Sequence, residues 1–266
     1  MRHFAPQLLL ATTLALLPLI GSAESVAVQP HQMGCVVLVH GLAGGRWNWI
    51  GMSGLLQRHG YHVVTLSYPS RSQSIQQSAQ ALIPAITECQ QQHAAPVHLV
   101  GHSLGGLLIR QYLQQYGDAG IGRVVMLGTP NHGSELSDQV SAQWPHERGI
   151  AYWLGPAVAQ LNTRSDGFIA QLAQPRVPTG IIAGYLTPTP WLNRRFKTAN
   201  DGLVAVYSTR LVQMQDFIVL PSIHASLPVN VDAQRQTLWF LSTGQFYRRA
   251  NQSEYALRLS GYRTQR

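Results

Sequence analysis

The chain has 266 residues, with 19 lysine or arginine against 11 aspartate or glutamate side chains and a net charge of +8. The length suits one α/β domain with a sizeable core. The basic residues are scattered and match no DNA- or RNA-binding motif, so we expect no nucleic-acid partner. We interpret the excess positive charge as a solvated basic surface. Peripheral contact with anionic membrane lipids is the alternative.

The first 23 residues predict a secretory signal peptide. Arg2 gives a basic start, residues 8–20 form an apolar run, and small residues at 21–23 precede Glu24. The run is shorter than the roughly 20 residues that span a bilayer, which argues against a membrane anchor. We therefore expect an exported protein, periplasmic or secreted, whose mature domain covers residues 24–266.

Short apolar runs rich in β-branched residues alternate with segments of helical period. The runs predict strands over 36–39, 62–66, 97–100, 123–127, 180–185 and 217–220. The other segments predict helices over 49–58, 74–92, 104–116 and 232–242, with Pro84 kinking or dividing the second. This alternation predicts a mostly parallel sheet with helices on both faces and the chemistry on the loops after the strands.

The two cysteines are predicted to form a structural disulfide. Cys35 begins the first strand, and Cys89 lies near the end of a crossover helix. In a parallel sheet, strand starts and crossover-helix ends share one edge, so a bond between them is geometrically reasonable. An exported location favours it, and neither cysteine is expected to be catalytic.

The loop after the first strand, His40-Gly41-Leu42, is the candidate for one half of an oxyanion hole. The backbone N–H of Leu42 is predicted to donate to the developing negative charge, while His40 shapes the loop. Trp47 and Trp49 follow closely and are predicted to wall the acyl or leaving-group side.

Residues 97–106, Val-His-Leu-Val-Gly-His-Ser-Leu-Gly-Gly, carry the Gly-x-Ser-x-Gly pattern of a nucleophile elbow. Gly101 and Gly105 have no Cβ to clash with a serine held near positive φ. A serine among glycines also occurs in ordinary loops, but a strand before and a helix after favour the elbow. Ser103 is therefore the predicted nucleophile, and the N–H of Leu104 is the second predicted oxyanion donor.

Residues 135–177 break the alternation, since apolar and aromatic residues there are interspersed with polar ones without a convincing strand. We interpret this segment as a small helical cap over the mouth of the site, lining an acyl pocket and moving as a lid. Trp153 is the predicted binding residue within it. The alternative, that these aromatics only pack a surface helix onto the core, stays open.

A serine hydroxyl needs a base, and in folds that carry the nucleophile on such an elbow the acid and then the histidine follow the serine in the chain. His224 follows the last predicted strand and is the preferred base. His132 and His146 are less suitable, because they precede the later strands whose ends would carry the partners.

The acid must lie between the serine and the histidine, on a loop after a strand. Asp201 meets this condition and is predicted to orient His224 and stabilise its protonated form. Asp216 begins a strand, which places it at the wrong edge of the sheet. The alternative is that Asp201 only shapes a turn.

Five segments together resemble a bacterial lipase of the α/β-hydrolase superfamily, including lipases related to the GPI-inositol deacylases. They are His-Gly-Leu at 40–42, Gly-His-Ser-Leu-Gly-Gly at 101–106, Gly-Thr-Pro-Asn-His-Gly-Ser at 128–134, Asn-Asp-Gly-Leu-Val at 200–204, and the late His224. The resemblance implies carboxylic ester hydrolysis by Ser103, His224 and Asp201, with residues 129–134 shaping the site.

Secreted lipases of this group often carry a calcium site near the acid, but no full set of calcium ligands is identifiable in this sequence. No metal or organic cofactor is therefore assigned, and calcium stays open.

The sequence predicts an exported serine ester hydrolase that cleaves a lipid or other acyl ester through an acyl-enzyme. Acyl transfer by the same three residues and a non-enzymatic binding role are the alternatives. The complete set of serine, aspartate and histidine argues against the binding role.

Overall fold

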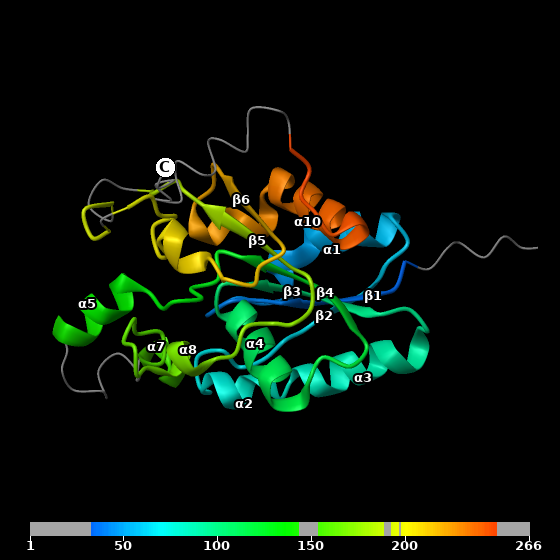
Figure 1. Ribbon diagram of the computed structural model, residues 1–266, viewed down its shortest axis with the longest axis horizontal. Helices are drawn as coiled ribbons and strands as arrows, with labels where there is room; N and C mark the ends of the chain where they lie inside the picture. The colour runs from blue at the N-terminus through cyan, green and yellow to red at the C-terminus, as the bar shows by residue number, and fades with distance from the viewer. Residues whose placement is uncertain (1–32, 144–153, 189–192, 197, 249–266) are drawn as a thin grey trace, which may run out of the picture. The chain divides into compact units, whose positions relative to one another are not determined.

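The computed structural model of the protein describes residues 33–143, 154–188, 193–196 and 198–248. Six strands form one sheet in the order β2-β1-β3-β4-β5-β6, and all neighbouring strands are parallel (Figure 1). The strands are β1 (Cys35–Val39), β2 (His62–Thr65), β3 (Val97–His102), β4 (Ile121–Leu127), β5 (Thr179–Gly184) and β6 (Asp216–Leu220). The predicted parallel α/β architecture is confirmed, and the loops after the strands meet at one edge.

Helices cover both faces of the sheet (Figure 1). On one face lie α1 (Ile50–Arg58) and α10 (Val231–Thr243); on the other lie α2 (Ile75–Ala79), α3 (Leu82–Gln92) and α4 (Leu104–Tyr116). Short 3-10 helices occupy three loops: η1 (Arg46–Trp49), η2 (Val206–Thr209) and η3 (His224–Val229).

The helix predicted over 74–92 is divided in two. The Ser74 hydroxyl accepts from the N–H of Gln77, and the Gln77 side chain accepts from the N–H of Ser74, so a capping box begins α2. A second helix, α3, starts at Leu82 and holds Pro84 as its third residue. In the first turn a proline's missing N–H removes no intrahelical bond, which explains why the break precedes Pro84.

Two apolar clusters, one on each face of the sheet, form the core. Alternate residues of β1 enter them: Val37 packs with Leu108 and the α2–α4 side, whereas Val36 and Leu38 pack with Phe240 on the α1–α10 side. This alternation follows from the two-residue period of a strand. Burial on both faces explains why the strands other than the partly exposed β2 have nearly continuous apolar sequences.

Between β4 and β5 the chain forms the short helices α5 (Glu135–Gln143), α7 (Pro156–Ala159) and α8 (Phe168–Gln171). The stretch beyond α8 is attached to α4 by Arg110, whose guanidinium donates to the carbonyls of Leu172 and Ala173. The same side chain donates to the carbonyl of Asn131 at 3.0 Å. Burial lowers the pKa of Arg110 to about 10, which leaves it charged at neutral pH.

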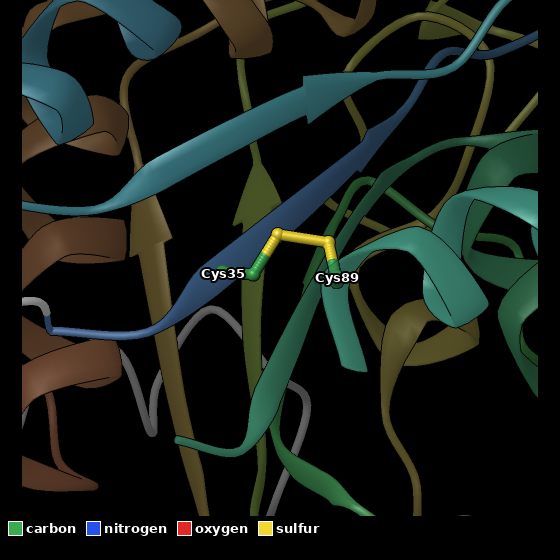
Figure 2. Close-up of a disulfide and its surroundings, with 2 residues drawn as sticks. All are labelled: Cys35 and Cys89. Atoms are coloured by element: carbon green, nitrogen blue, oxygen red, sulfur yellow. A yellow bond between two sulfur atoms is a disulfide. The ribbon is translucent and has the colours of Figure 1, made fainter. Parts of the chain in front are cut away.

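A disulfide joins Cys35 on β1 to Cys89 on α3, as Figure 2 shows. The two residues are 54 positions apart in the sequence. Closing a loop of this length in the unfolded chain stabilises a fold by about 4 kcal/mol in the chain-entropy account. The bond ties the start of the sheet to the end of a covering helix, at the edge opposite the loops that follow the strands.

The predicted signal peptide, residues 1–23, lies outside the described part of the chain, so it stays a prediction. Within the part that the structure describes, no helix is both long enough and apolar enough to cross a membrane.

Candidate active site

Ser103 stands at a sharp turn between β3 and α4, with φ 52° and ψ −121°. A side chain seldom adopts this conformation, which costs about 1–3 kcal/mol and persists only where the surroundings enforce it. The flanking glycines are required by close packing. A Cβ on Gly101 would lie 2.6 Å from the Gly106 nitrogen, and one on Gly105 would lie 2.2 Å from the Val39 oxygen.

Three side chains form a hydrogen-bonded line at this turn. His224 Nε2 lies 2.8 Å from Ser103 Oγ, and His224 Nδ1 lies 2.7 Å from Asp201 Oδ2. A carboxylate can only accept, so Nδ1 carries the proton and Nε2 is left to accept the serine hydroxyl. This is the arrangement in which a histidine can act as a base toward serine.

The loop around Asp201 holds its carboxylate in place. Asp201 is fully buried, and its Oδ1 accepts the N–H groups of Leu203 at 3.0 Å and Val204 at 2.8 Å. The backbone N–H of His224 also donates to the Asp201 carbonyl at 2.9 Å. These bonds leave Oδ2 directed at the His224 ring, so the backbone fixes which carboxylate oxygen faces the imidazole.

The loop after β1 packs against the serine. A Cβ on Gly41 would lie 3.0 Å from Ser103 Cβ, which measures how closely the two backbones approach. A turn follows, in which Gly44 N–H donates to the Gly41 carbonyl and Ala43, at φ 55°, donates to Ser70 Oγ at 2.9 Å.

Leu42, within this turn, and Leu104 line the same cavity as Ser103. Leu104 is the first residue of α4, where a backbone N–H has no acceptor within its own helix. The position of both residues beside the nucleophile is compatible with the predicted oxyanion hole, and the donor roles stay a prediction.

His40 is buried beneath this loop. Its Nδ1 lies 2.8 Å from the Gly41 carbonyl, and its ring stacks on Tyr68 with centroids 4.3 Å apart. The Tyr68 hydroxyl donates to the His40 carbonyl at 2.6 Å. Burial lowers the pKa of His40, so the ring is held neutral and shapes the loop.

A cavity of about 520 Å³ opens above Ser103. Described residues of the predicted cap supply much of its apolar wall: Leu136, Leu154, Val158 and Leu161. Trp47, which is 65% exposed, lines it from the opposite loop, as predicted for a wall residue. Leu154 and Leu161 are among the apolar residues of the cap that was predicted to line an acyl pocket. Sequence reasoning missed Leu136, Val158 and Leu203, because nothing in a local pattern indicates which further apolar side chains of a loop meet a distant serine.

The interpretation of Trp49 as a substrate-binding residue is wrong. Its side chain is fully buried and packs with Met52 and Phe240 in the core between the sheet and α1–α10. Trp47 and Trp49 lie two residues apart on η1, so they project in different directions, one to the cavity and one to the core. Trp153 lies outside the described residues.

A second cavity, of about 690 Å³, lies between β6 and α10 and is lined by Trp239 and Tyr247 among others. Neither Ser103 nor His224 lines it. The smaller cavity is therefore the candidate active site, because it alone of the two contains the nucleophile and base.

His102, the variable residue before the serine, was not singled out by sequence reasoning. Its Nε2–H donates to the His224 carbonyl at 3.0 Å, and the two rings have centroids 4.9 Å apart. Burial, followed by the nearby His224, lowers the pKa of His102 to about 3. A neutral His102 thus connects the elbow to the backbone of the base without adding a positive charge beside it.

Buried neutral histidines predict that the protein loses stability in mild acid. Burial lowers the pKa of His98 to about 4, with Arg123 adding to the effect, and that of His102 to about 3. The unfolded chain takes up these protons near pH 6.5, so stability falls as pH drops from about 6.5 towards 4. Each such group contributes up to about 1.4 kcal/mol per pH unit in that window. Urea unfolding between pH 7.5 and 4.5 measures the slope.

A His98→Asn variant tests the origin of this slope, because an asparagine oxygen can replace Nδ1 as the acceptor of the Arg123 N–H. We expect a smaller slope for His98→Asn and an unchanged one for His59→Asn, whose side chain is exposed. Equal slopes in all three proteins would contradict the assignment.

Among the described residues, a single group of three or more histidine, cysteine or acidic side chains is close enough to share a metal ion: Cys35, His62 and His93. It lies at the start of the sheet, at the edge away from Ser103, and contains no carboxylate. Calcium prefers oxygen ligands, so this group does not match a calcium site.

Comparisons with known proteins show which proteins this chain resembles in sequence and fold. A curated triacylglycerol lipase from Burkholderia plantarii is 32% identical over 149 residues, which are 49% of this chain and 41% of that protein. The chain thus spans less than half the length of this relative. The solved structure of the Bacillus licheniformis lipase BlEst2 in its mature form matches with a TM-score of 0.63 and 22% identity, covering 80% of this chain and 93% of that one.

The phospholipase PlaB from Legionella pneumophila matches with a TM-score of 0.57 and 16% identity, covering 85% of this chain and 62% of that one. Both structural likenesses show a shared fold. The family model described as alpha/beta hydrolase fold matches residues 34–166, which include the β1 loop and the elbow. This chain belongs to the α/β-hydrolase fold family.

Proposed function

We propose that this protein is an exported serine hydrolase of carboxylic esters. The observation that carries the proposal is the pair of hydrogen bonds from His224, at 2.8 Å to Ser103 Oγ and 2.7 Å to Asp201 Oδ2, at the end of an apolar cavity. Similarity to a triacylglycerol lipase supports an ester as substrate. The basic, apolar start of the chain supports export.

The reaction divides into two halves. Ser103 Oγ attacks the ester carbonyl while His224 Nε2 takes the hydroxyl proton, and the N–H groups of Leu42 and Leu104 stabilise the oxyanion. His224 then gives the proton to the departing alkoxide, which leaves as the alcohol. In the second half, water attacks the acyl carbonyl while His224 takes one of its protons. His224 then returns this proton to Ser103 Oγ as the carboxylic acid leaves. Asp201 stabilises the imidazolium in both halves.

The apolar walls favour a lipid or another ester with an extended acyl chain. Trp47, Val158 and Leu161 line the space above Ser103, and no aspartate, glutamate, lysine or arginine is among the described residues that line it. The chemistry assigned to these residues requires no organic cofactor.

Hydrolysis of p-nitrophenyl esters of increasing acyl length tests the proposal, using the mature protein with and without a chelator. We expect activity that rises with chain length and does not depend on calcium. Loss of activity on chelation would identify a metal requirement that the proposal lacks. Transfer of the acyl group to an added alcohol in preference to water would favour the acyltransferase alternative.

Filling the cavity should change chain-length preference. A Val158→Trp variant places a larger side chain at an 8% exposed position of the wall. We expect kcat/KM for long acyl chains to fall roughly 10-fold or more relative to short ones. Val212→Trp is the control, because Val212 is 87% exposed and lies outside the cavity lining. An equal preference in both variants would count against Val158 as part of the acyl site.

A further inference from the structure

Three potential metal ligands lie together at the edge of the sheet opposite the active site, and a fourth is bonded to one of them. Cys35, His62 and His93 each offer one ligand atom, and these three atoms all lie within 4.8 Å of one another. The two imidazole rings have centroids 4.8 Å apart. The fourth side chain, Cys89, is bonded to Cys35 (Figure 2).

The fold brings these side chains together as two pairs. Cys35 and His62 are register partners on the parallel strands β1 and β2, so their side chains project from the same face of the sheet. Cys89 and His93 are four residues apart at the end of α3, and the His93 N–H donates to the Cys89 carbonyl at 3.0 Å. This spacing directs both side chains to one side of the helix end. The disulfide joins one pair to the other.

Two thiolates and two imidazoles are a donor set that tetrahedral Zn²⁺ prefers, and residues four apart at a helix end can reach the same ion. A sulfur within a disulfide is not a thiolate and is a poor ligand. The oxidised protein therefore offers a metal only the two imidazoles. We propose that the disulfide masks a zinc site formed by Cys35, Cys89, His62 and His93, which binds Zn²⁺ when the two cysteines are reduced.

Conversion of the disulfide to the zinc-binding form requires one two-electron reductant. A dithiol passes two electrons and two protons to the disulfide, becomes a disulfide itself, and leaves the thiols of Cys35 and Cys89. Binding of Zn²⁺ then displaces both thiol protons to solvent. Both cysteines are fully buried, whereas His62 is exposed and His93 is half-buried, so the histidines form the solvent side of the site.

Bound zinc replaces the connection between β1 and α3 that is lost when the disulfide is reduced. In the oxidised protein the disulfide attaches β1 to α3; in the reduced protein the metal attaches β1, β2 and α3 through four side chains. Because the ion binds the folded site, it stabilises the reduced protein by mass action. The site lies away from Ser103 and does not depend on the proposed ester hydrolysis.

The test uses Zn²⁺ and the spectroscopic probe Co²⁺ with the full chain, oxidised or reduced by a phosphine. We expect the reduced protein to bind one ion with thiolate-to-cobalt charge-transfer and tetrahedral absorption bands, at least about 1,000-fold more tightly than the oxidised protein. Zinc should also raise the Tm of the reduced protein. Equal affinity in both redox states, or cobalt spectra without charge-transfer bands, would overturn the proposal.

A matched pair of variants separates the folded site from chelation by an unfolded reduced chain. His62→Gln removes one exposed ligand, whereas His59→Gln removes a nearby exposed histidine that is outside the cluster. We expect His62→Gln to weaken zinc binding to the reduced protein and to reduce the rise in Tm, and His59→Gln to leave both unchanged. Equal effects of the two substitutions, or no rise in Tm in the wild-type protein, would reject the site.

Discussion

A Ser103→Ala variant should lose ester hydrolysis almost completely while retaining its fold. His224 Nε2 lies 2.8 Å from Ser103 Oγ, and alanine leaves no nucleophile at that position. Removal of the nucleophile in a serine–histidine–aspartate site lowers kcat by roughly 10⁴- to 10⁶-fold. Steady-state hydrolysis of a p-nitrophenyl ester, with circular dichroism of the same preparation, measures both properties. Turnover equal to that of the wild-type protein would reject Ser103 as the nucleophile.

The serine's conformation supplies an independent test at the same position. At φ 52° a side chain is strained, whereas glycine is not. A Ser103→Gly variant should therefore be inactive like Ser103→Ala, but its free energy of unfolding should be higher by about 1 kcal/mol. Paired urea denaturations of the two variants measure the difference. A less stable glycine variant would mean that the strained turn relaxes when the serine is removed.

The elbow could be predicted because its requirements are local. A Cβ at Gly101 or Gly105 would lie 2.2–2.8 Å from neighbouring backbone atoms, so both positions require glycine, and the motif contains both glycines. Most strands were also predictable, since burial on both faces leaves an apolar run that can be recognised without knowing what packs against it. The strand β2 is partly exposed and was recognised from its β-branched residues. The divided helix around Pro84 follows equally from the chemistry of one residue.

Side chains that depend on tertiary contacts could not be predicted in this way. Trp47 and Trp49 are equally apolar and two positions apart, yet one lines the cavity and the other fills the core. The turn of η1 directs the two side chains apart, and α10 covers Trp49 with Phe240. A local sequence pattern does not show that a distant helix packs there. The same holds for Leu136 and Val158, which reach the site from a segment without a strand. His102 occupies a variable motif position, and its bond to the His224 carbonyl becomes visible only when both loops are placed.

An Asp201→Asn variant should retain its stability and lose about 10⁴-fold in kcat. The N–H groups of Leu203 and Val204 already donate to one oxygen of this side chain, so an asparagine must keep its carbonyl there. Its amide NH₂ then faces His224 Nδ1 and donates to it. This forces the imidazole proton onto Nε2, which can no longer accept the proton of Ser103.

Asp216→Asn is the matched control for the same chemical change. Asp216 is also buried, but it accepts from the Phe246 N–H at 2.7 Å and forms an ion pair with Arg248, away from Ser103. We expect this variant to lose about 1–2 kcal/mol of unfolding free energy with kcat nearly unchanged, because the buried Asp216 side chain loses the charge that accepts from Arg248 and the Phe246 N–H, outside the site. Urea unfolding and kcat are measured on both variants. We expect Asp201→Asn to lower kcat and leave the unfolding free energy unchanged, and Asp216→Asn to lower the unfolding free energy and leave kcat nearly unchanged. If Asp201→Asn lost stability but kept its kcat, Asp201 would be a turn residue, and the acid that orients His224 would have to be sought elsewhere.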